Sequence, residues 1–120
     1  MKETTNEKLL LLRETGIMDE QVFDYIKKID QCLCREVEDM DNEMLLIHLV
    51  MAMNRIAKGE EIEALPAEIL DGLRSRIEFA EAKTYFSYLK LALPAELPSY
   101  EEGYIMLHLV NILKNAAREH

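Results

Sequence analysis

Two histidines in similar helical segments are the residues of this chain best suited to chemistry. His48 lies in Glu-Met-Leu-Leu-Ile-His-Leu-Val, which starts at residue 43, and His108 lies in Glu-Gly-Tyr-Ile-Met-Leu-His-Leu-Val, which starts at residue 102. A buried imidazole is costly unless its nitrogens are hydrogen-bonded or used. The shared His-Leu-Val is also a first hint of internal repetition.

The second histidine shares a polar helical stripe. Tyr104, His108, Asn111 and Asn115 follow one another at spacings of three and four residues, which places them on one face of a helix. Hydroxyl and amide groups on that face could hold the imidazole in one tautomer. We expect Tyr104 and Asn111 to support an anion attached to His108.

The first histidine shares its stripe with Met44, Met51 and Arg55. Arg55 follows His48 by seven residues, or about 10 Å along the axis at 1.5 Å per residue. Its long side chain could reach toward the histidine, and we therefore expect Arg55 to be an anion partner.

Several chemistries are open to such histidines. A neutral imidazole nitrogen can attack a phosphoryl donor, and the product adds about two negative charges. Two hydrogen-bonded core histidines are the plain alternative. Neither Glu-x-x-His nor His-x-x-x-His occurs here, so a metal site is not expected. The serines lie in no catalytic motif and no glycine-rich phosphate loop is present, so we expect no enzyme and no cofactor.

Composition limits the class of protein. The 120 residues are 49% hydrophobic and 31% charged, which is typical of one soluble globular domain. The formal net charge is −9 and no basic cluster occurs, so direct nucleic-acid binding is not expected. The polar N-terminus does not resemble a signal peptide, and the longest apolar runs are too short to span a membrane.

The two cysteines add little. Cys32 and Cys34 are two positions apart in a predicted helix, so they point to different faces and a disulfide would strain the backbone. We expect reduced thiols and a cytoplasmic location.

Helical periodicity continues through almost the whole chain. The spacing predicts helices over residues 6–14, 19–37, 42–58, 67–91 (broken near Gly72) and 100–117, and glycines, Asp19, Pro66 and the box Ser99–Glu102 mark their ends. No segment alternates like a strand. We predict an all-α antiparallel bundle of five main helices, with a short N-terminal helix and lead-in at 1–18 and the helical domain at 19–120.

The segments around the histidines resemble the PTS regulation domain (PRD) of bacterial antiterminators and activators that control sugar-utilisation genes. The first family motif, His-Leu-x-x-x-x-x-Arg, reads here from His48 to Arg55. The second, Glu-x-Gly-Tyr-Ile-x-Leu-His, ends at His108; Glu102 directly precedes the glycine and Glu101 takes the family spacing. The likeness covers about residues 19–118.

The resemblance implies a five-helix bundle that dimerises and receives phosphate from a phosphocarrier protein or a sugar-permease subunit of the phosphotransferase system. His48 and His108 take the phospho-acceptor positions. Family regulators commonly carry two such domains behind a nucleic-acid-binding domain. This sequence shows one, so we expect a stand-alone signalling or transcription-regulation module that alters dimer or partner association, without touching nucleic acid or membrane itself.

One departure keeps an alternative open. Ile47 stands where some family members have an acidic residue directly before the first histidine. The alternative is a helical dimerisation or protein-binding module that keeps only the fold and is not phosphorylated. It would use an apolar helix face rich in methionine, made of Met40, Met44, Met51 and Met53.

Overall fold

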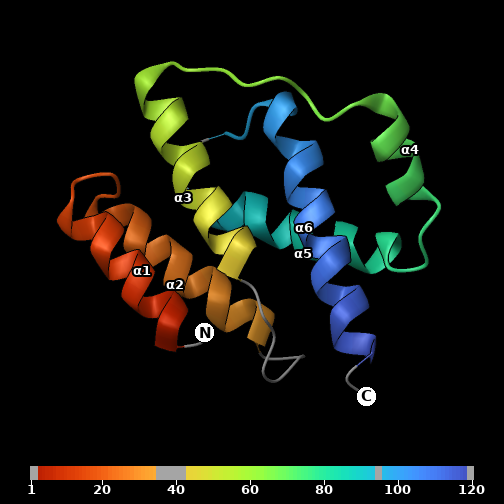
Figure 1. Ribbon diagram of the computed structural model, residues 1–120, viewed down its shortest axis with the longest axis horizontal. Helices are drawn as coiled ribbons and strands as arrows, with labels where there is room; N and C mark the ends of the chain where they lie inside the picture. The colour runs from red at the N-terminus through yellow and green to blue at the C-terminus, as the bar shows by residue number, and fades with distance from the viewer. Residues whose placement is uncertain (1–2, 35–42, 94–95, 119–120) are drawn as a thin grey trace. The chain divides into compact units, whose positions relative to one another are not determined.

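The regular secondary structure of the described residues is all helical, as predicted. The computed structural model describes residues 3–34, 43–93 and 96–118 (Figure 1). These residues form α1 (Glu3–Glu14), α2 (Glu20–Cys34), α3 (Glu43–Lys58), α4 (Ala67–Arg74), α5 (Phe79–Ala92) and α6 (Ser99–Arg118). None of the helices in these ranges is long and apolar enough to cross a membrane.

The contacts divide the chain into two compact units, Met1–Glu60 and Glu61–His120. In the first unit α1 packs on α2, and α2 packs on α3. Figure 1 shows α1 and α2 as an antiparallel pair joined by a short turn. In the second unit α4 and α5 both pack on α6. The five-helix antiparallel bundle and the domain boundary at residue 19 stay predictions.

The glycine stops predicted for two helices are confirmed. Gly16 follows α1 with φ 84° and Gly59 follows α3 with φ 71°, a left-handed conformation that glycine adopts without strain. After α1, the amide of Ile17 donates to the carbonyl of Leu12 at 3.1 Å; after α3, Glu60 donates to Arg55 at 2.9 Å. Both bonds satisfy carbonyls that a helix end leaves open.

The start of α2 is also as predicted, but its buried face differs at one position from the predicted apolar stripe. The Asp19 carboxylate accepts the Val22 amide at 2.8 Å, the bond expected of an N-cap. Of the predicted apolar stripe, Ile26 and Ile29 are buried, while Val22 is only half-buried and Phe23 is buried beside it. Leu33 and Val37 of that stripe lie outside the residues whose side chains are described.

The break predicted near Gly72 is present, but it begins three residues later. Gly72 lies within α4, and the chain leaves the helix over residues 75–78. Two short-range bonds form this turn: the Arg76 amide donates to Leu73 and the Phe79 amide donates to Arg76. Pro66 is the N-cap residue of α4, which begins at Ala67 as predicted. The predicted cap at Asp41 or Asn42 lies outside the described residues.

Candidate functional site

The helices that carry the two histidines bury the same positions. Around His48, α3 buries the positions −3, −2, +1, +2, +4 and +5 relative to the histidine, namely Leu45, Leu46, Leu49, Val50, Ala52 and Met53. Around His108, α6 buries the same six relative positions, namely Ile105, Met106, Leu109, Val110, Ile112 and Leu113. Each histidine therefore lies beside, and not within, the buried stripe of its helix.

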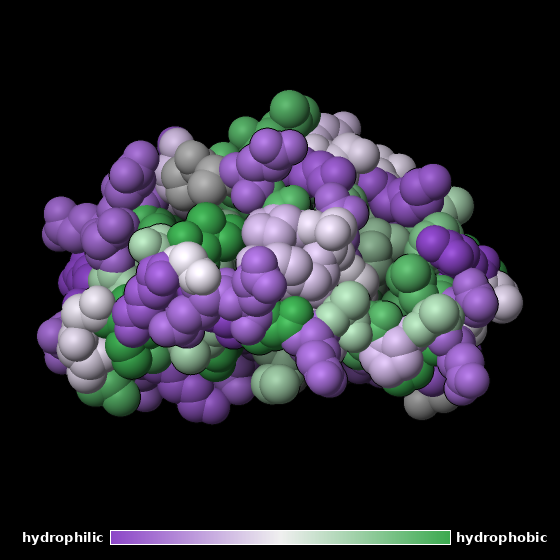
Figure 2. Space-filling model, turned by 90° about the horizontal axis from the view of Figure 1, so that it is seen from above, coloured by the Kyte–Doolittle hydropathy of each residue, from purple (hydrophilic) through white to green (hydrophobic). Residues whose placement is uncertain are grey.

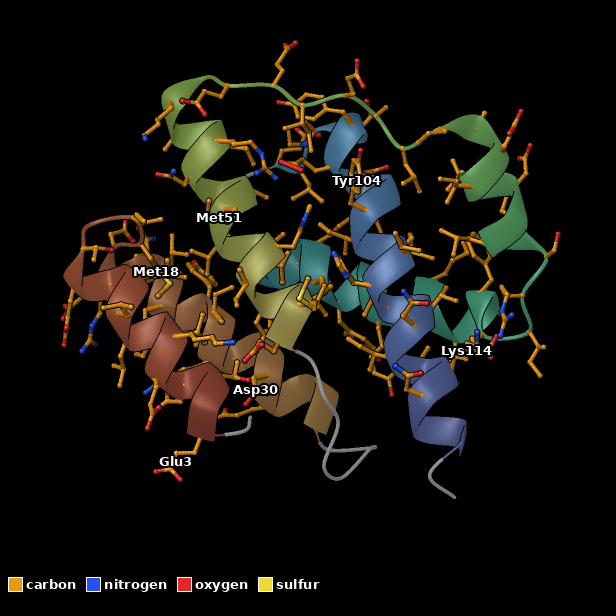
Figure 3. The ribbon with its side chains drawn as sticks, in the orientation of Figure 1. Glu3, Met18, Asp30, Met51, Tyr104 and Lys114 are labelled. Atoms are coloured by element: carbon orange, nitrogen blue, oxygen red, sulfur yellow. The ribbon has the colours of Figure 1, made fainter. Side chains whose placement is uncertain are left out.

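His48 itself is half-buried, and its Nε2 atom is buried. Its neighbours one turn before and after are apolar and open to solvent: Met44 is 66% exposed and Met51 is 37% exposed. Figure 3 labels Met51 on α3. Arg55 is half-buried two turns further along the same helix. This imidazole therefore lies in an apolar stretch of helix surface with a cation at its far end.

The predicted methionine-rich face is only partly exposed. Met44 and Met51 reach solvent, whereas Met53 is buried at 6% exposure. Met40 lies outside the described residues. Of that predicted face, the described and exposed members are Met44 and Met51, which lie on either side of His48 along the helix.

The start of the His48 helix is held by α1, which sequence reasoning missed. The Glu43 carboxylate accepts a hydrogen bond from the Thr5 hydroxyl at 3.1 Å and from the Lys8 ammonium at 3.0 Å. Thr5 is almost fully buried. Nothing in the local pattern links positions 38 and 35 residues apart, so no sequence signal could have found this contact.

His108 is half-buried on α6 in a more polar setting. Asn111 and Asn115, one and two turns beyond it, are exposed. Side-chain amides offer both donors and acceptors, so Asn111 can hydrogen-bond an imidazole or an anion on this face. The predicted polar stripe of α6 is thus present on the helix surface.

Tyr104 is occupied by a tertiary contact. Its hydroxyl donates to the Glu63 carbonyl at 3.0 Å, and Figure 3 shows it near the segment that leads into α4. Close packing accounts for the glycine of the second motif. A Cβ at Gly103 would lie 3.0 Å from the Leu65 Cβ. Gly103 and Tyr104 thus seat the 61–66 segment on α6, and the anion-supporting role of Tyr104 stays a prediction.

Two glutamates open α6 with different surroundings. Glu101 is fully buried, and its amide donates to the Pro98 carbonyl. Glu102, half of the predicted capping box, pairs with Lys90 of α5 at 3.0 Å. Both carboxylates lie in the first turn, where the helix dipole favours negative charge.

One carboxyl of the second unit has a shifted acidity. The backbone amide of Glu78 lowers the pKa of its own carboxyl, assisted by the Arg76 side chain at 3.3 Å and by the charge of Lys114 on α6. Lys114 is labelled in Figure 3. The Arg76–Glu78 pair itself lies within the turn that precedes α5.

The predicted site residues fall into two sets. His48 and Arg55 lie in the unit Met1–Glu60, and Tyr104, His108 and Asn111 lie in Glu61–His120. The side chains of Cys32 and Cys34 are outside the described set. Among the described residues, no three histidines, cysteines or acidic residues gather as metal ligands would.

Comparison with known proteins identifies the pattern. The sequence model of the PRD domain matches residues 23–112, which include both histidines. YhfY, an uncharacterized protein of Escherichia coli (strain K12), is 27% identical over 116 residues, covering 93% of this chain and 97% of that protein. No solved structure matches the chain.

Proposed function

Because this chain belongs to the PRD domain family, we propose that it is a regulatory module that accepts phosphate on histidine from phosphotransferase-system proteins. The observation that carries the proposal is the family match, which spans both histidine motifs. The repeated setting of His48 and His108, each beside a buried stripe of six apolar side chains, supports it. A half-buried histidine beside the core is held in place by its buried neighbours, and part of the residue remains accessible from the helix surface.

The chemistry needs no cofactor. A neutral imidazole nitrogen of His48 or His108 attacks the phosphorus of a phosphohistidine on a phosphocarrier protein or permease subunit. The new nitrogen–phosphorus bond forms as the donor's nitrogen–phosphorus bond breaks. The donor imidazole leaves with the electron pair of that bond, and the phosphoryl group passes to this chain.

His108 is the better placed of the two acceptors. Asn111 is exposed one turn away and can donate its amide to a phosphoryl oxygen, a charge-assisted hydrogen bond. The Tyr104 hydroxyl, now bonded to Glu63, is a second donor that a phosphate can compete for. At His48, the buried Nε2 lies away from a visiting donor, and Arg55 supplies the nearest predicted countercharge.

A phosphate would act as a switch through its charge. Each phosphohistidine adds about two negative charges to a chain already at −9. One or two charge-assisted contacts, at about 1.5–3 kcal/mol each, are enough to move a two-state equilibrium more than tenfold. We infer that the equilibrium shifted by phosphate is the association of this chain with a second copy or with a regulatory partner.

The test is phosphoryl transfer to the purified chain. Incubation with a phosphocarrier protein, its kinase and labelled phosphoenolpyruvate should place acid-labile label on the wild type. The double variant His48→Ala/His108→Ala should lose it, and the control His120→Ala, a histidine outside both motifs, should keep it. An unlabelled wild type, or a double variant labelled like wild type, would overturn the proposal.

A second candidate rests on the exposure of Met44 and Met51. Flexible apolar side chains at a surface suit protein–protein contact, and here they flank His48. A binding module that is never phosphorylated would keep its dimer mass and its partner when both histidines are changed to glutamine. Loss of association in His48→Gln/His108→Gln counts against it.

A further inference from the structure

The second unit contains a small cleft that the proposed phosphoryl transfer does not use. It lies between α4, α5 and α6 and encloses about 240 Å³. Apolar side chains form much of its lining: Leu70 from α4, Phe79 and Phe86 from α5, and Met106 from α6. Pockets for drug-sized molecules measure about 300–1,000 Å³, so this cleft suits a smaller body, about the size of one ring.

Two cations lie on this apolar cleft. Lys83 lines it with its ammonium 6.0 Å from the centre of the Phe79 ring, and none of the ion pairs formed among the described residues includes Lys83. Arg74 also lines it, and pairs with Asp71 at 3.0 Å. Both side chains of that pair are mostly exposed, and exposed pairs contribute little, so the Arg74 guanidinium is free to exchange partners.

The negative charge of the lining is already offset. Its carboxylate, Glu102, pairs with Lys90 at 3.0 Å. In a chain with a net charge of −9, an apolar hollow that carries Lys83 and Arg74 is a local reversal of sign. Such a site attracts anions. The lining includes one hydroxyl, that of Ser99, which offers little to a polyol.

We propose that this cleft binds a small organic anion with an apolar ring. The anionic head, a phosphate monoester or a carboxylate, is bound by Lys83 and Arg74. The ring lies against Phe79 and Phe86, where burial of apolar surface adds affinity. Neither His48 nor His108 lines this cleft, so the chain would report on a metabolite as well as on phosphate transfer.

Titration of the full-length chain with phenyl phosphate and with benzoate, followed by NMR chemical shifts, tests the proposal. Inorganic phosphate and phenol serve as the head and the ring alone. We expect saturable binding of at least one ring anion, with shifts confined to α4–α6 residues, and weaker binding of both fragments. Whichever of phenyl phosphate and benzoate binds more tightly identifies the head group.

The variant Lys83→Met should weaken that binding by about tenfold or more, because it removes a charge-assisted contact, and Arg74→Gln should weaken it in the same direction. The matched control is Lys27→Met, since Lys27 lies over Phe23 in the first unit at 4.5 Å and should leave binding unchanged. His48→Ala/His108→Ala should also bind normally, which separates this site from phosphoryl transfer. Absence of saturation up to about 10 mM, phenol binding as tightly as phenyl phosphate, or an unaffected folded Lys83→Met would overturn the proposal.

Discussion

The two units of this chain share a plan and differ at the face that carries chemistry. Each has three helices in the described residues, and the third of each carries a histidine followed by Leu-Val. Counted from the histidine, α3 and α6 bury the same six positions. The two helices, 60 residues apart, therefore present the same amphipathic pattern to their cores.

The neighbours of the two histidines outside the buried stripe differ between the helices. One turn before and after His48 stand Met44 and Met51; at the equivalent places around His108 stand Tyr104 and Asn111. The first pair is apolar and exposed, while the second offers hydrogen-bond donors. Packing therefore imposes the same buried stripe on both helices. The neighbours of each imidazole differ, and they determine which hydrogen bonds or charges are available to it.

Exposed apolar side chains are not confined to the neighbourhood of His48. Figure 2 shows hydrophilic side chains over much of one face, with hydrophobic patches between them. Exposed large apolar residues occur in both units, for example Met44 in the first and Leu91 in the second. Scattered exposed apolar groups are ordinary; those beside His48 are notable for their position.

The largest expected effect tests the shared core. Leu49 and Leu109 directly follow the histidines and are 0% and 1% exposed. Because truncation leaves a cavity, Leu49→Ala and Leu109→Ala should each lower the free energy of unfolding by about 2–5 kcal/mol, measured by urea denaturation. Leu91→Ala, at 86% exposure, is the control and should change it by less than about 0.5 kcal/mol. A small loss for one of the two buried leucines would break the equivalence of the helices.

Substitutions at two glycines test how closely the 61–66 segment packs on α6. Gly72 in α4 has open space around it, so Gly72→Ala should stabilise the protein by up to about 1 kcal/mol through helix propensity. Gly103→Ala carries the same gain but brings its Cβ to 3.0 Å from Leu65, and we expect a net loss of about 1 kcal/mol. Thermal unfolding of both variants measures these two stability changes. Equal gains at the two positions would show that Leu65 yields freely.

Removal of the Tyr104 hydroxyl should have a smaller effect. Tyr104→Phe deletes the hydrogen bond to Glu63 and should cost about 0.5–1.5 kcal/mol of unfolding free energy. Tyr88→Phe is the control, since Tyr88 is 56% exposed on α5. The first unit has no equivalent of this contact, because Met44, the residue at the position equivalent to Tyr104, has no hydroxyl group. If both tyrosine variants unfold alike, the contact does not hold the segment in place.

The smallest effect concerns pH. The pKa of Glu78 is lowered in the folded protein by its own backbone amide first and by Arg76 second. A lowered folded pKa stabilises the protein above the unfolded pKa, about 4.3 for glutamate, and this is lost as pH falls through the folded value. The melting temperature of wild type should therefore exceed that of Glu78→Gln slightly at pH 7, and the two should converge in acid. A constant gap from pH 7 to pH 3 would contradict this assignment.

Much of the helical layout was predictable from local signals. Gly16, Gly59 and Asp19 mark helix ends through backbone chemistry that a sequence displays directly. The break before α5 was misplaced at Gly72 because a glycine in open space can remain helical. The real break depends on turn hydrogen bonds at Arg76 and Phe79, which no residue type announces.

The helical placement of the two histidines was predictable from the sequence, but the tertiary contacts around them were not. His48 and His108 lie at the edge of their buried stripes, as amphipathic spacing suggests. The bonds of Glu43 to Thr5 and Lys8, and of Tyr104 to Glu63, join positions 35 to 41 residues apart. Such contacts depend on how helices pack, so spacing along one helix cannot reveal them. The cations Arg74 and Lys83 on one cleft are another example.

We propose that both motif histidines accept phosphate, and that His108 is the stronger acceptor because Asn111 is exposed one turn away and the Nε2 atom of His48 is buried. The most direct measurement is mass spectrometry of peptides from the chain after phosphoryl transfer, digested at a pH that preserves phosphohistidine. We expect phosphate on the α6 peptide that contains His108, and less phosphate on the α3 peptide that contains His48. Phosphate on neither peptide, or on the peptide of His120 alone, would contradict it.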